Sequence, residues 1–236
     1  MIDLVYKDII QNRKLILLYA LLGGFVGLVM IASGSDGGGV FTAYVMISTY
    51  GFAVRSTYDE DKSGAYLFLK SLPLSDAAIV ASKFLSILAV SVMLVIFFNI
   101  TAVLGAYLGA SGIVPGLGSS PAARGALDVM AVLRGNAVSF AIVFSFALIF
   151  VGIYLLIFFW AGFAKASTYS RAILLAVFVM VMIGAGAIGH LPAVRNFVRF
   201  IGTSSWLPAI SVITSLGVYS ILCALCIGRV KVKDWS

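Results

Sequence analysis

The stretch Ile79–Leu108, IVASKFLSILAVSVMLVIFFNITAVLGAYL, decides what kind of fold this sequence can adopt. It contains one charged side chain, Lys83, near its start. Its polar residues, such as Asn99 and Thr101, can bond neighbouring helices or their own backbone. About 20 largely apolar residues are enough for an α-helix to cross the hydrocarbon layer of a membrane. The stretch therefore predicts a transmembrane helix.

The composition of the whole chain extends this prediction. Hydrophobic residues make up 62% of the sequence and charged residues 11%, and the mean hydropathy is +1.12. Soluble domains are about half apolar and about a quarter charged, so the bilayer must be the solvent for most of this chain. The formal net charge is +7, but Lys and Arg occur in small groups between apolar runs. This distribution favours membrane topology over nucleic-acid binding.

Five further segments are long and apolar enough to span, which predicts an all-α membrane protein with six transmembrane helices. The predicted spans are Leu15–Ser33, Val40–Thr57, Ile79–Leu108, Val138–Phe163, Ala172–Gly189 and Leu207–Gly228. Twelve of the sixteen Lys and Arg residues fall on one side of the membrane when the connections are counted alternately. The positive-inside rule then predicts cytoplasmic N and C termini. We expect one transmembrane domain over residues 1–236.

Two segments are predicted to lie along the membrane. In residues 1–13, Ile2, Val5 and Ile9 recur at helical spacing, which suits an interfacial helix that leads into the first span. On the outer side, residues 190–205 form an external loop that is expected to contain a short amphipathic helix. A second external loop is predicted at residues 110–135.

Patterns that could carry chemistry are better explained by membrane structure. Cys223 and Cys226 lie in an apolar run and the single histidine, His190, has no carboxylate or cysteine beside it, so we expect no metal site. The glycines of GAGAIG, Gly184–Gly189, follow no strand and suit close helix packing. We predict no catalytic residue and no cofactor in this chain. Every Asp, Glu, Lys and Arg is expected in a loop or at a span end, so no ion-coupling group is visible.

The segment Ser56–Asp76, STYDEDKSGAYLFLKSLPLSD, contains four of the nine carboxylates. Residues 66–72 have the length of two helical turns, and Pro73 ends them because proline lacks an N–H group and disfavours helix in the residue before it. Ser75 suits an N-cap for the next helix. One interpretation is a membrane-hugging elbow with solvated acids. The other is a docking element for a soluble partner.

The order of a short amphipathic N-terminus, two spans, an acidic loop, LKSLPLS and Lys83 resembles the permease subunits of type-2 ABC transporters. The similarity is greatest to small bacterial permeases that export peptides or toxins. It implies that residues 58–76 are a cytoplasmic coupling loop with a coupling helix between spans two and three. The residues that the resemblance assigns to coupling with the ATPase are Asp59, Glu60, Asp61, Lys62, Tyr66, Leu67, Phe68, Leu69, Lys70, Leu72 and Pro73.

The resemblance also implies partners and a mechanism. Two ATPase subunits would bind ATP and Mg²⁺. Two permease chains, as a homodimer or as a heterodimer with a sister permease, would export an amphipathic or hydrophobic peptide across a bacterial cytoplasmic membrane. The chain itself would not be an enzyme. Two alternatives stay open from the residues alone: a non-transporting immunity, sensor or scaffold protein in the membrane, and an ion-coupled secondary carrier.

Overall fold

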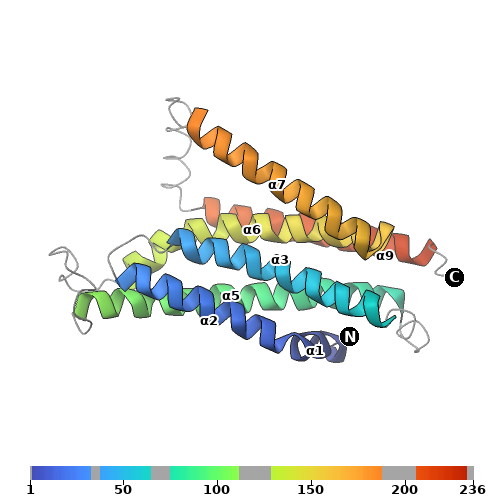
Figure 1. Ribbon diagram of the computed structural model, residues 1–236, viewed down its shortest axis with the longest axis horizontal. Helices are drawn as coiled ribbons and strands as arrows, with labels where there is room; N and C mark the ends of the chain where they lie inside the picture. The colour runs from blue at the N-terminus through green and yellow to red at the C-terminus, as the bar shows by residue number, and fades with distance from the viewer. Residues whose placement is uncertain (1, 33–37, 65–74, 112–128, 188–205, 233–236) are drawn as a thin grey trace.

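The computed structural model describes residues 2–32, 38–64, 75–111, 129–187 and 206–232, and these ranges contain helices and no strand. The all-α prediction is confirmed for this part of the chain. The helices are α1 (Ile2–Gln11), α2 (Arg13–Ala32), α3 (Gly38–Ser63), α5 (Asp76–Ser111), α6 (Val129–Ala161), α7 (Phe163–Ala187) and α9 (Leu207–Val232) (Figure 1).

Each predicted span coincides with one of the long helices from α2 to α9. By length and composition, α5, α6 and α9 could each cross a membrane, and the bent pair α1–α2 is a fourth candidate if it counts as one span. Helix α3 is not among these candidates, and five of its last nine residues are charged. The count of six transmembrane helices is therefore not confirmed and stays a prediction.

Three helix ends extend into segments that the sequence predicts as loops. Helix α3 continues to Ser63, so the first residues of the predicted loop 58–76 are helical. Helix α5 reaches Ser111 and α6 begins at Val129, which shortens the predicted external loop 110–135 at both ends. The predicted coupling helix at 66–72 and the outer helix within 190–205 lie outside the described residues.

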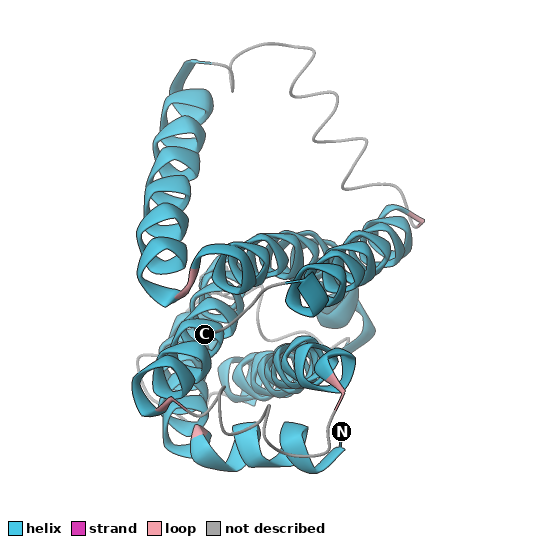
Figure 2. Cartoon of the chain, turned by 90° about the vertical axis from the view of Figure 1, so that its right-hand side faces the viewer, coloured by secondary structure: helices cyan, strands magenta, loops and turns pink. Residues whose placement is uncertain are grey.

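Helices α2, α3, α5, α6 and α9 run side by side, and α7 diverges from them (Figures 1 and 2). The divergence begins at Gly162, which connects α6 to α7 and has a φ of +85°. This left-handed conformation favours glycine because other residues would bring Cβ against the backbone. Helix α1 and the C-terminal end of α9 lie at the same end of the bundle (Figure 1).

The core is built mainly where α6 packs against α9, α2 against α5, and α3 against α6. Its largest fully buried side chains include Phe52, Phe98, Tyr154 and Phe159. Most polar groups inside it are paired, because lipid offers them no hydrogen bonds, and the exceptions among the described residues are the hydroxyls of Ser48 and Ser145. The Thr57 hydroxyl bonds that of Tyr154 and the carbonyl of Ala53.

Helix α1 meets α2 at an angle of 61°. Asn12 makes this elbow: its backbone N–H and its side-chain Nδ2 both donate to the carbonyl of Asp8, at 3.2 and 3.1 Å. Its own carbonyl accepts the N–H of Ile16 at 3.1 Å. Asn12 therefore ends one helix and starts the next. The predicted helix near the N-terminus is confirmed, and its position at the membrane interface stays a prediction.

Close packing of α2 against α3 and α5 generates the first prediction, at Gly23. A Cβ atom there would lie 2.7 Å from Cγ of Tyr44 and 2.9 Å from Cζ of Phe98. We expect Gly23→Ala to lower the free energy of unfolding by about 1–3 kcal/mol through overpacking, measured by thermal unfolding in detergent. Gly217 on α9 has nothing within 4 Å of such an atom, so Gly217→Ala is the matched control. Equal stability of the two variants would contradict the packing described here.

Candidate functional site: a buried ion cluster

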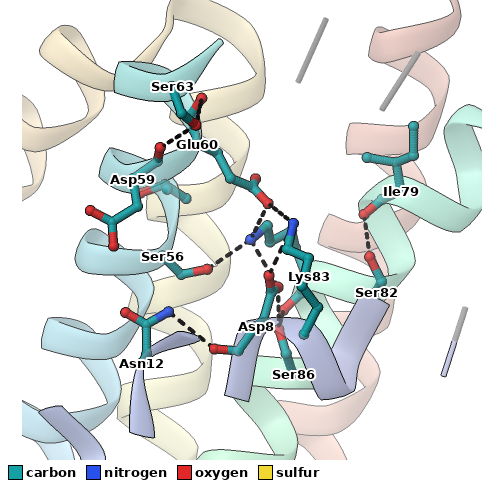
Figure 3. A network of polar contacts seen from close by, with 12 residues as sticks. Asp8, Asn12, Ser56, Asp59, Glu60, Ser63, Ile79, Ser82, Lys83 and Ser86 are labelled. Atoms are coloured by element: carbon teal, nitrogen blue, oxygen red, sulfur yellow. Dashed lines mark hydrogen bonds and ion pairs between the residues drawn. The ribbon is translucent and has the colours of Figure 1, made fainter. Parts of the chain in front are cut away.

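Helix α1 turns a charged residue inward and apolar residues outward. Asp8 is 2% exposed, whereas Ile2 and Tyr6 are 78% and 65% exposed. Helix α1 packs mainly on α5, and Asp8 points at that helix (Figure 3). The spacing of Ile2, Val5 and Ile9 in the predicted interfacial helix does not predict the burial of Asp8. The physical reason is a cationic partner inside the bundle.

That partner is Lys83, two turns into α5. Its ammonium Nζ lies 2.8 Å from Oδ2 of Asp8, 2.7 Å from Oε1 of Glu60 and 2.7 Å from Oγ of Ser56 (Figure 3). An ammonium group has three N–H donors, so each finds one acceptor here. Side-chain exposure is 4% for all three charged residues. Lys83 thus ties together α1, α3 and its own helix.

A second ammonium group completes the cluster from outside. Lys7, whose side chain is 40% exposed, places Nζ 3.4 Å from Oε1 of Glu60 and 3.8 Å from Oδ1 of Asp8. The Ser86 hydroxyl lies 3.3 Å from Oδ2 of Asp8. Two carboxylates thus face two ammonium groups, and the formal charge of the cluster is zero.

Regular helix geometry brings these groups together. Ser56 and Glu60 are four residues apart on α3, and Lys83 and Ser86 are three residues apart on α5. Residues at these spacings lie on one face of a helix, one above the other. Each helix therefore presents two polar groups to its neighbour at the same level of the bundle.

A buried ion cluster is poor evidence for extra stability, because desolvation of the charges offsets their attraction. Removing one charged member of the cluster nevertheless lowers the stability of the fold, because its partner then stays buried as an unpaired charge. The arrangement is suited to fix the relative positions of α1, α3 and α5. Ionisable groups within membrane helices are functional candidates by default.

Of the coupling residues predicted from the sequence, four are in the described part of the structure and the others are not. Asp59, Glu60, Asp61 and Lys62 lie in the last turns of α3. Asp61 and Lys62 are exposed, and Asp59 pairs with Arg55 at 3.1 Å. Glu60 is 3% exposed and points into the ion cluster, so it is no solvated acid. The other predicted residues, Tyr66, Leu67, Phe68, Leu69, Lys70, Leu72 and Pro73, lie outside the described residues.

Sequence reasoning missed the cluster, although two signals pointed to it. Lys83 lies in an otherwise apolar helix, which requires a nearby carboxylate or carbonyl. Ser86 adds a polar group three residues later, on the same face of the helix. The partners Asp8 and Glu60 could not be chosen without the packing, because Asp3, Asp59 and Asp61 lie close to them in sequence.

Other chemistry-bearing residues do not assemble into a site. Cys223 and Cys226 are free thiols on α9, and Cys226 is in the core. His190 lies outside the described residues. Within the part of the chain that is described, no group of three His, Cys, Asp or Glu residues could hold a metal ion.

Long apolar helices, several of which are able to cross a membrane, indicate a multi-pass helical membrane protein.

A comparison with models of protein families identifies the family. The model of the ABC-2 family transporter protein matches residues 3–119, about half of the chain and the half that contains the cluster. The chain therefore belongs to the ABC-2 transporter family and is an ABC-2 type permease, a family of non-catalytic transmembrane subunits. Membership implies an ABC ATPase as partner. A search of curated proteins found no match.

The second prediction concerns Lys83. We expect Lys83→Met to lower the free energy of unfolding by about 3–5 kcal/mol, because two carboxylates then stay buried without a cation between them. Adding Asp8→Asn and Glu60→Gln to this variant should restore part of the loss. Thermal unfolding in detergent measures both effects.

Lys62→Met is the matched control, since Lys62 is exposed on the last turn of α3. It should change the free energy of unfolding by no more than about 0.5 kcal/mol. If the triple variant were less stable than Lys83→Met alone, the buried charges would not be the cause of the loss.

Proposed function

We propose that this chain is the transmembrane subunit of an ATP-driven exporter and that residues 66–72 couple it to the ATPase. One observation supports this most directly. Glu60 and Lys83 bracket the predicted coupling segment, and their charged groups lie 2.7 Å apart. The 22 residues between them thus begin and end at one fixed point of the bundle. A force on the segment would reach α3, α5 and, through Asp8, α1.

In the working transporter, two such chains as a homodimer would combine with two ATPase subunits that bind ATP and Mg²⁺. Closure of the ATPase pair would push on the coupling segments, and the permease halves would alternate between inward-facing and outward-facing states. Both termini and residues 58–76 would then be cytoplasmic, as the positive-inside rule predicts. The membrane would be that of a bacterial cell.

The proposed cargo is an amphipathic or hydrophobic peptide. The aromatic-rich segment Phe144–Trp160 does not strengthen this proposal, because most of its rings are buried in the core. Phe146 and Trp160 are its exposed aromatic residues. The choice of peptide therefore rests on the resemblance to small exporter permeases.

Docking of the ATPase is the third prediction. We expect Phe68→Asp and Leu69→Asp each to weaken co-purification with the ATPase about thirtyfold, the effect of losing a ~2 kcal/mol contact. ATP turnover of the reconstituted complex in proteoliposomes should fall with it. Ile2→Asp, at an exposed apolar residue of α1, is the matched control. Unchanged association and turnover would reject residues 66–72 as the docking element.

Glu60 gives the fourth prediction. Because its carboxylate faces Lys83, Glu60→Gln should leave ATPase association intact and lower the transport per ATP hydrolysed about tenfold, within the range of coupling energies. Asp3, an exposed acid of α1 outside the predicted coupling loop, provides the control, Asp3→Asn. Loss of association in Glu60→Gln would place Glu60 at the docking surface instead.

Transport by the unmodified protein that persists without ATP and collapses with an uncoupler would contradict the proposed exporter and favour a secondary carrier.

A further inference from the structure

A groove of about 410 Å³ lies between α2, α3 and the start of α7. Its walls are apolar and aromatic, with contributions from Leu15, Tyr19, Ile47, Val54, Tyr58 and Phe163. The ion cluster is separate from it, since none of the cluster's charged residues lines the groove.

The floor of the groove depends on Gly51. A Cβ atom at this position would lie 3.0 Å from the ring carbons Cε2 and Cζ of Tyr19. The absence of a side chain therefore lets the Tyr19 ring cross α3 closely. From Ile47 to Arg55 the groove follows two turns of α3, about 12 Å at 1.5 Å per residue.

One end of the groove is cationic. Arg55 lines it there, and its side chain is 56% exposed. Lys14 directly precedes Leu15, and Lys165 comes two residues after Phe163, and both are exposed. The carboxylate that faces Arg55 is Asp59, at 3.1 Å. Exposed ion pairs four residues apart on a helix contribute little, so Arg55 can accept a second anionic partner.

We propose that this groove binds an acyl chain of an anionic phospholipid, with the phosphate group at Arg55. Hydrocarbon fits the apolar walls, and a phosphate ester complements the guanidinium group, which donates paired hydrogen bonds to such oxygens. Basic residues at a membrane surface attract anionic lipids in the same way. An apolar helix from a second copy would fill the walls and leave Arg55 with no anionic partner other than Asp59. This proposal is independent of ATP coupling.

Native mass spectrometry of the full chain in detergent tests the proposal, with an equal mixture of phosphatidylglycerol and phosphatidylcholine of identical acyl chains. We expect preferential retention of one phosphatidylglycerol per chain. Arg55→Gln should reduce that retention about tenfold, the loss expected for one charged hydrogen bond. Arg171→Gln, which changes an exposed base on α7 outside the groove, should retain the lipid.

Asp59→Asn distinguishes lipid binding from a purely structural role of the Arg55–Asp59 ion pair. If Arg55 binds the lipid, removing the competing carboxylate should increase phosphatidylglycerol retention. If the ion pair is only structural, Asp59→Asn and Arg55→Gln should both lower retention, which would contradict the proposal. Equal retention of the two lipids by the unmodified chain would also overturn the proposal.

The apolar part is tested by Ile47→Trp, which fills the groove and should displace the lipid. Ile213→Trp is its control, since Ile213 is an exposed residue of α9 outside the groove. If Ile47→Trp shifted the ratio of monomer to dimer and left lipid retention unchanged, a second copy would be the occupant and the lipid proposal would be wrong.

Discussion

The buried ammonium group of Lys83 constrains the rest of this end of the molecule. A lysine whose side chain is 4% exposed in an apolar helix needs a partner for each of its three N–H donors. Asp8, Glu60 and Ser56 supply those partners from two other helices. This requirement explains why α1 turns Asp8 inward although Ile2 and Tyr6 stay exposed. It also explains why α3 stays helical beyond the apolar part of its sequence, since Glu60 must reach the same point.

The position of the cluster along the chain matters more than its strength. Glu60 precedes the predicted coupling segment and Lys83 follows it, so one ion pair fixes both of its ends. A segment held in this way transmits displacement to the helices that carry its ends. Asp8 extends the link to α1, and Asn12 continues it through the elbow into α2. In the proposed mechanism, a force on residues 66–72 would therefore also move the N-terminal helix.

The sequence predicted the helices well, because long apolar runs can satisfy their backbone in a membrane only as helices. Helix ends were predicted less well, because composition shows only where an apolar run stops. Helix α3 continues beyond its apolar run, through the polar segment TYDEDKS. The cluster was not predicted, since Asp8 and Ser86, which contact each other in it, are 78 residues apart in sequence. Only helix packing selects Asp8 and Glu60 among nearby acids. The groove was missed for a similar reason. Its walls come from three helices, and Gly51 signals only that some group approaches closely.

Helix α3 carries ionic residues on two faces, and the two sets differ in burial and in access to solvent. Ser56 and Glu60 face inward, where every donor of Lys83 has an acceptor and the formal charge is zero. Arg55 and Asp59, one residue earlier in each turn, form a second ion pair, and Arg55, which is 56% exposed, lines the groove. A closed, neutral cluster resists ligands and suits the transmission of force. An open, cationic pair beside an apolar groove recruits an anion. The same two turns of helix therefore carry an internal link and an external binding site, and substitutions at adjacent residues act on different properties.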